Sequence, residues 1–82
     1  MKLNILTPDN VLYTGDNVYL VQLPGEDGSF EIMNRHAALI SVLKKWKIKV
    51  EIKWENPIFF DINGGVIEVL ENNVQILAEW RI

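Results

Sequence analysis

Strict alternation of apolar and polar side chains in the middle of this chain limits what it can fold into. From Trp46 to Trp54, an apolar residue stands at every second position, with lysine or glutamate between. A period of two is typical of a strand with one buried and one solvated face, and both tryptophans fall on the apolar face of this pattern. Glu55-Asn56-Pro57 signals a turn, and residues 58–62 resume the alternation. The two runs predict a β-hairpin.

Extended runs separated by turn signals fill the rest of the chain. Three precede residue 24 (KLNILT, VLYT and NVYLVQL), and two follow the break at residues 63–65 (NGG). Asn72-Asn73 is predicted to be the last turn, because asparagine tolerates the positive φ that hairpin turns require. The final strand is predicted to place four side chains on one face: Val74, Ile76, Ala78 and Trp80. This spacing predicts one all-β domain over residues 1–82, a small two-layer β-sandwich of about 8–10 short, mostly antiparallel strands.

Residues 35–45 fit two secondary structures. Four of them recur at helical spacing: His36, Leu39, Ile40 and Leu43. Ile40 and Val42 are β-branched, which favours a strand. The local sequence is therefore compatible with either a short helix or a strand.

Composition excludes several classes of function. The length of 82 residues allows one domain, and the formal net charge of −3 gives no basic face for nucleic acid. The absence of cysteine excludes disulfides and zinc–thiolate sites, and it favours an intracellular location because small secreted domains usually carry disulfides. No apolar stretch approaches the ~20 residues of a membrane span, so no direct membrane insertion is expected.

The basic residues gather in one segment, which Glu51 and apolar residues interrupt. They are Lys44, Lys45, Lys47, Lys49 and Lys53. This pattern favours a solvated strand face over a phosphate-binding or lipid-binding surface.

The segment from Pro24 to Leu39 holds the candidates for a chemical site. It contains the only histidine, His36, but its acidic residues have no metal-ligand spacing and no nucleophile accompanies it. A structural or interface histidine is the favoured interpretation. Residues 25–28 (GEDG) are predicted to form a tight turn with glycines at positive φ, because the two carboxylates would repel a phosphate. We therefore expect no catalytic residue, no metal and no cofactor, and we interpret the chain as an interaction module.

The order of several short motifs resembles one known family. Near the start, Thr7-Pro8 ends an extended run, and Leu12-Tyr13 precedes Thr14-Gly15. Residues 36–40 (HAALI) are similar to the family element HAPLL. Residues 64–69 (GGVIEV) and 72–79 (NNVQILAE) are similar to its signatures GG(I/F)LEV and NNVTVLAD. From about residue 2 to residue 79, the chain resembles the N-terminal β-sandwich domain of the ATP synthase epsilon subunit.

This resemblance implies a non-catalytic role. Members of the family bind the gamma subunit with one surface and the polar loops of the membrane rotor ring of c subunits with another. They thereby couple the two parts of the rotor in an F-type proton-translocating ATP synthase. The resemblance implies the same partners here, and a peripheral position on the cytoplasmic face of a bacterial inner membrane. It also favours a strand over a helix for residues 38–43.

Four residues match contact positions of the family and two more flank them, and the resemblance implies a role for each. Ser29 matches a position near the loops of the rotor ring. The matches on or beside the gamma-facing surface are Thr7, His36 and Ser41. Glu31 and Arg35 flank these positions and are expected to supply rim contacts.

The chain departs from the family pattern in several places, including Glu31, which stands where the family has glycine, and Lys44-Lys45-Trp46, near which the family has KPG. Asn34-Arg35 stands where the family has Pro-Gly before the histidine, and Ala38 stands where it has proline. Many members also continue into a C-terminal helical hairpin, so this chain, which stops at Ile82, resembles the short form of the family.

The alternative function is a stand-alone β-sandwich that binds a peptide or a carbohydrate. A carbohydrate site would gather exposed aromatic rings in one shallow groove, and the candidates are Trp46, Trp54 and Trp80. Burial of these rings between the layers would oppose that function.

Overall fold

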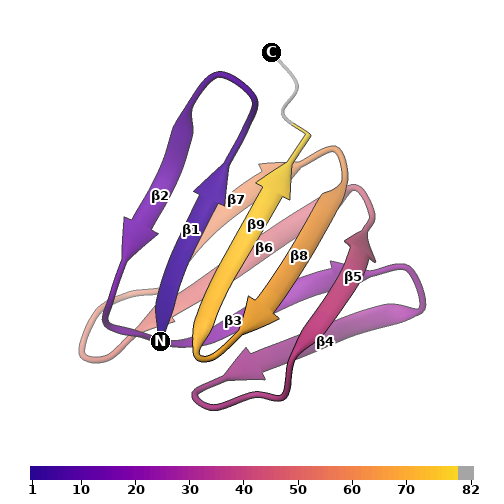
Figure 1. Cartoon of the computed structure of the whole chain (residues 1–82). Helices are drawn as coiled ribbons and strands as arrows, with labels where there is room; N and C mark the ends of the chain where they lie inside the picture. The colour runs from indigo at the N-terminus through magenta and orange to yellow at the C-terminus, as the bar shows by residue number, and fades with distance from the viewer. Residues whose placement is uncertain (80–82) are drawn as a thin grey trace.

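The computed structural model describes residues 1–79, which form strands joined by turns and loops. The strands are β1 (Lys2–Leu6), β2 (Val11–Gly15), β3 (Val18–Gly25), β4 (Gly28–Met33), β5 (Leu39–Leu43), β6 (Trp46–Ile52), β7 (Ile58–Ile62), β8 (Gly65–Leu70) and β9 (Asn73–Ala78) (Figure 1). These nine strands within residues 1–79 confirm the predicted all-β class. Over the same range there is no helix long and apolar enough to span a bilayer.

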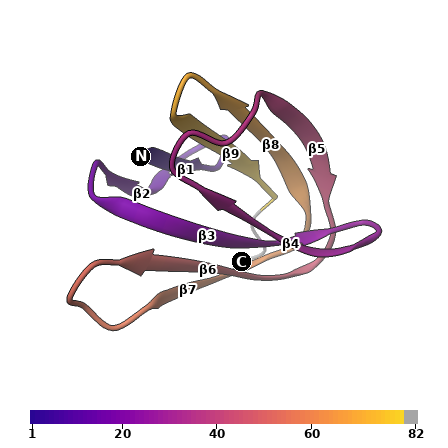
Figure 2. The same ribbon diagram turned by 90° about the horizontal axis from the view of Figure 1, so that it is seen from below.

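One curled sheet supplies both layers of the sandwich. Its strands are hydrogen-bonded in the order β2-β1-β9-β8-β5-β3-β6-β7, and β4 pairs with β3 outside this path. Between β5 and β3 the only paired residues are Gly25 and Leu43, so the sheet turns a corner there. The first layer holds β2, β1, β9, β8 and β5, and the second holds β4, β3, β6 and β7 (Figure 2). β1 and β9 are parallel, whereas the other pairs are antiparallel, as predicted for most of them.

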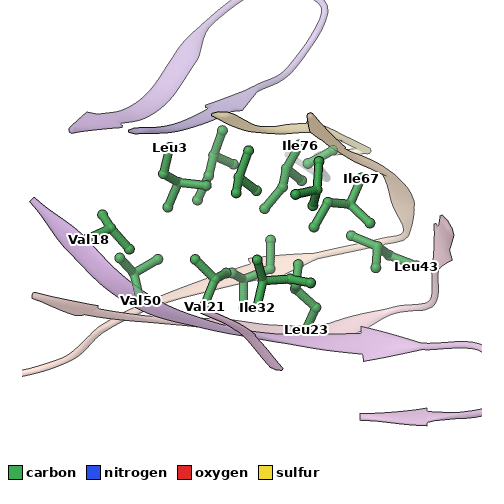
Figure 3. Packing of buried hydrophobic residues seen from close by; sticks show 14 of the residues in the cluster. Leu3, Val18, Val21, Leu23, Ile32, Leu43, Val50, Ile67 and Ile76 are labelled. Carbon is green, nitrogen blue, oxygen red and sulfur yellow. The ribbon is translucent and has the colours of Figure 1, made fainter. Parts of the chain in front are cut away.

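The hydrophobic core lies between the two layers. Leu3 and Ile76 of the first layer point toward Val21 and Val50 of the second (Figure 3), and all four are fully buried. Alternation along each strand sends every second side chain into this space. Burial of an aliphatic side chain of this size contributes about 1.5–3 kcal/mol relative to exposure. No polar or charged side chain is buried in the part of the chain that the structure describes.

Residues 39–43 are strand β5, so the helical alternative for residues 35–45 was wrong. β5 pairs with β8 along its whole length, from Leu39 opposite Val69 to Leu43 opposite Gly65. This pairing buries Leu43 in the core. The helical spacing was a local pattern, and long-range strand pairing overrode it.

The final hairpin confirms a buried face and corrects the predicted turn. The buried side chains of β9 are, as predicted, Val74, Ile76 and Ala78. The predicted partner Trp80 lies outside the described residues. The turn is Glu71-Asn72, with φ of 49° and 63°, and not Asn72-Asn73. Pairing of the buried residues Val69 and Val74 fixes the register, which leaves positions 71 and 72 as the loop.

The β6–β7 hairpin is confirmed, but its two tryptophans are not buried. Ile48 and Val50 fill the inner face of β6, whereas Trp46 is 65% exposed and Trp54 is 91% exposed. β6 ends at Ile52, whose carbonyl accepts a hydrogen bond of 3.2 Å from the Glu55 N–H. The chain therefore reverses before Trp54 can continue the alternation. Trp46 is the first residue of β6 and is paired with Ile62 of β7.

Candidate interaction surface

The six predicted contact residues do not form one site. Ser29 and Ser41 come together, because both line an open hollow of about 380 Å³ beside the β3–β4 turn. Ser41 is half-buried and shares its strand face with the buried Leu43, so it faces between the layers and not outward. In the turn itself Gly28 has a φ of 130°, as predicted, whereas Gly25 has no positive φ.

Thr7 and Glu31 lie on different layers. Thr7 is in the β1–β2 turn, where its Oγ1 accepts a hydrogen bond of 3.0 Å from the Asn10 N–H. Glu31 is exposed on β4, opposite Gln22 of β3. The two residues therefore belong to separate surfaces of the sandwich.

Arg35 and His36 are exposed in the turn that follows β4. Arg35 has a φ of 63°, and its N–H donates a hydrogen bond of 2.9 Å to Asn72 Oδ1 in the β8–β9 turn. The His36 N–H donates to the Met33 carbonyl at 3.2 Å. These contacts hold the turn in a conformation that glycine adopts more easily than arginine. The Pro-Gly of the resembled family places glycine at position 35, which is consistent with this geometry.

Arg35→Gly is expected to raise the free energy of unfolding by about 0.5–1 kcal/mol. A positive φ costs a side chain about 1–2 kcal/mol, and the greater freedom of glycine in the unfolded chain offsets part of that gain. Urea denaturation measures the change. Arg35→Ala removes the same side chain but keeps the backbone strain, so its stability should stay within about 0.5 kcal/mol of the wild type. Equal stabilisation by both variants would assign the effect to the side chain instead.

The described residues hold no cluster of side chains suited to metal binding. Within residues 1–79, no three histidine or acidic side chains approach closely enough to hold a metal ion. The ring Nδ1 of His36 lies 2.8 Å from the carbonyl oxygen of the neighbouring residue Ala37, a local backbone contact. The His36 side chain is exposed.

A polar cross-strand pair shifts the pKa of two surface groups. The Tyr19 hydroxyl donates a hydrogen bond of 2.7 Å to Glu51 Oε1, and Lys49 Nζ lies 3.1 Å from the other carboxylate oxygen. The hydrogen bond from Tyr19, with a contribution from Lys49, lowers the pKa of Glu51. The same hydrogen bond raises the pKa of Tyr19. The pair joins β3 to β6 and faces solvent. We therefore interpret it as a contact that stabilises the pairing of the two strands and not as an acid–base site.

A row of apolar side chains, which the sequence patterns did not predict, crosses the outer face of the first layer. We call it the outer apolar row. Each member lies opposite the next on the neighbouring strand, in the order Val11, Leu6, Leu77, Val66 and Val42. Val42 and Leu77 are about half exposed. The row borders an open hollow of about 580 Å³, which Thr7 and Pro8 also line.

The neighbouring row on the same face is mainly polar. It contains Thr14, Asn4, Gln75, Glu68 and Ile40. A contiguous exposed apolar patch with a polar border is typical of a protein–protein contact. Adjacent apolar residues such as Val66-Ile67 and Ile76-Leu77 were the signal in the sequence, because a half-buried strand would place a polar residue at one of the two positions.

The exposed tryptophans do not form one aromatic groove. Trp46 begins β6, and Trp54 lies two residues beyond its end. A strand of seven residues spans roughly 20 Å, at about 3.3 Å per residue. The two rings line different hollows. This separation counts against a carbohydrate platform, although neither ring is buried between the layers.

The fold and this surface define a class of protein: a small β-sandwich domain with an exposed apolar row across the outer face of one layer. A family model described as ATP synthase, Delta/Epsilon chain, beta-sandwich domain matches residues 1–81. The chain belongs to this family.

Relatives in bacteria are similar along the whole chain. The chain is 40% identical over 82 residues to an ATP synthase epsilon chain of Sulfurimonas denitrificans, covering all of this chain and 62% of that protein. It is 38% identical over 78 residues to one of Chlorobium limicola, covering 95% of this chain and 88% of that protein. The chain thus spans less than two thirds of the first relative and most of the second.

Two solved structures share the fold. A chain in the central stalk and c-ring of the Tetrahymena thermophila mitochondrial ATP synthase superimposes with a TM-score of 0.82, at 21% identity, over 96% of this chain and 63% of that chain. A chain in the Euglena gracilis mitochondrial enzyme gives a TM-score of 0.89, at 17% identity, over 98% of this chain and 51% of that chain. At these identities the likeness concerns the fold alone.

Proposed function

We propose that this chain is a non-catalytic central-stalk subunit of an F-type proton-translocating ATP synthase and couples the gamma subunit to the membrane rotor ring. Membership of the delta/epsilon family supports this proposal. The outer apolar row is the observation that carries it, because a rotor subunit must dock firmly on another protein.

In this proposal the gamma subunit covers the outer face of the first layer. The outer apolar row supplies buried area, and Glu68, Gln75 and Thr7 supply polar contacts at its border. Charged and polar rim contacts set register and association rate more than affinity. Arg35 and His36 extend the same contact at one end of the sandwich.

The β3–β4 turn is the proposed contact for the polar loops of the rotor ring. Glu26 and Asp27 of the turn and Ser29 of β4 are exposed, and the turn projects from the sandwich (Figure 2). Ser29 occupies the position that the resemblance assigns to this contact. Through these two partners the subunit is held at the cytoplasmic face of a bacterial inner membrane, as a peripheral component.

Isothermal calorimetry with the gamma subunit from the same source tests the proposal. The wild-type chain is expected to bind, and Val66→Glu is expected to weaken binding at least about 100-fold, because an unpaired carboxylate would be buried at the centre of the contact. Phe59→Glu places the same charge at a similarly exposed apolar residue on the second layer, and it should bind like the wild type.

Two results would contradict the proposal. A folded wild-type chain that does not bind the gamma subunit would reduce the family relationship to a shared fold. Equal binding by the wild type and Val66→Glu would move the gamma contact away from the outer apolar row.

A further inference from the structure

A basic and aromatic surface lies on the second layer and on the β5–β6 turn, and it shares no residue with the outer apolar row. We call it the lysine–tryptophan patch. Its members are Lys44, Lys45, Trp46, Lys47, Lys49 and Phe59, and they line an open hollow of about 500 Å³. The proposed contacts with the gamma subunit do not use this patch.

The strands and one turn bring these side chains together. Alternation on β6 directs Lys47 and Lys49 outward, and Phe59 of β7 is paired with Lys49. The Lys44 N–H donates a hydrogen bond of 2.9 Å to the Pro24 carbonyl, which fixes the β5–β6 turn against the end of β3. The patch therefore stands on a rigid support and not on a long loop.

The charge of the patch is only partly compensated. Lys47 lies 3.4 Å from the Asp61 carboxylate, and Lys49 lies 3.1 Å from that of Glu51. Among residues 1–79, no carboxylate lies within 4.0 Å of the ammonium group of Lys44 or Lys45. These two exposed lysines give the patch its free positive charge.

The residue types fit a bilayer surface better than one bound anion or an acidic peptide. All four cations are lysines, which are flexible, hydrated point charges, whereas arginine suits bidentate binding of a single carboxylate or phosphate. Trp46 and Phe59 are each more than half exposed beside them. An acidic peptide would leave these rings in water, but the headgroup region of a bilayer accommodates aromatic rings next to lysine side chains.

We infer that the lysine–tryptophan patch rests on the headgroups of an anionic phospholipid surface. The orientation of the patch toward the membrane rests on the proposed function, in which the β3–β4 turn contacts the rotor ring. Ser29 connects the two features, because it lines both this hollow and the one beside that turn. A turn that meets the rotor ring at the membrane brings the patch to the level of the bilayer surface. The charge and the aromatic side chains support binding to an anionic lipid surface independently of that orientation.

Cosedimentation of the full chain with vesicles tests this inference. Binding is expected to vesicles of phosphatidylcholine with about one third phosphatidylglycerol, and not to phosphatidylcholine alone. Each lysine near an anionic surface contributes about fivefold to partitioning, or about 1 kcal/mol. Lys44→Glu/Lys45→Glu should therefore lower binding at least about 25-fold at low ionic strength. Raising the salt concentration to about 0.5 M should weaken wild-type binding, because screening then acts over only a few ångströms.

A second double variant separates the patch from net charge. Lys2→Glu/Lys53→Glu changes the total charge by the same amount at two exposed lysines outside the patch, and it should retain most of the binding. Thermal melting checks that both variants fold. In a chain with Trp54→Phe and Trp80→Phe, the fluorescence of Trp46 should shift to shorter wavelength when anionic vesicles are added.

Several results would overturn the inference. They are no binding of the wild type to anionic vesicles, equal loss in both double variants, or preferential binding of polyglutamate, which would assign the patch to an acidic protein segment. Calorimetry with the gamma subunit keeps this test separate from the proposed function, because Lys44→Glu/Lys45→Glu should bind that subunit like the wild type.

Discussion

Gly65→Ala is expected to lower the free energy of unfolding by about 3 kcal/mol or more. Gly65 begins β8 between two paired strands, opposite Leu43 of β5 and Ala78 of β9. A Cβ atom there would overlap the Leu77 carbonyl oxygen and lie 3.1 Å from the Ala78 Cα. The β9 backbone cannot move away without breaking its ladder, so the strain of overpacking adds to the backbone cost of an unusual φ. Urea denaturation followed by circular dichroism measures the loss.

Gly28→Ala is the matched control for this prediction. Gly28 has a φ of 130°, and a Cβ there would meet nothing within 4 Å. Its substitution should therefore cost only the backbone term, about 1 kcal/mol. Equal losses at positions 28 and 65 would show that the contact with β9 does not matter. The close approach of β9 also explains physically why the family signature has glycine at position 65.

The strands and their buried faces could be predicted from the sequence because alternation reports burial directly. Ile48 and Val50 were placed correctly, as were the hairpin turn after β6 and the strands before residue 24. Errors fell at strand ends, where alternation carries no information. Trp54 continues the apolar period but lies in a turn, and the last hairpin turn lies one residue earlier than predicted.

The candidate surface was harder to predict because it depends on pairing between distant strands. Val42, Val66 and Leu77 become neighbours only through the register of β5, β8 and β9. Within its own segment, none of these residues indicates a shared surface, because single exposed apolar residues are common. The family resemblance implied partners, four contact positions and two flanking residues, yet it did not reveal that Ser41 faces between the layers.

The two proposed surfaces lie on opposite layers of one sandwich, so they can be occupied together. The outer apolar row belongs to β2, β1, β9, β8 and β5, whereas the lysine–tryptophan patch belongs to β6, β7 and the turn before β6. Their chemistry also differs: the first is apolar with a polar border, and the second is basic with aromatic side chains. The proposed position between a protein partner and a membrane requires two such faces, and a rigid core keeps them in fixed relation.

Ile67→Ala is expected to lower the free energy of unfolding by about 3–4 kcal/mol, because it leaves a cavity in the core. Ile67 is fully buried in the centre of β8, paired with Ile76 of β9 and Ser41 of β5. A domain of this size has a total stability of only about 4–12 kcal/mol, so the midpoint of urea denaturation should fall sharply.

Val66→Ala, at the neighbouring position, is the control that separates folding from binding. Val66 is 41% exposed on the outer apolar row, so its truncation should cost less than about 1 kcal/mol of stability. Its effect should appear instead as weaker binding to the gamma subunit. A large loss of stability at Val66, or a small one at Ile67, would contradict the assignment of the two faces of β8. Because the two residues are adjacent in sequence but point to opposite faces, this pair tests whether the core and the contact surface are physically distinct.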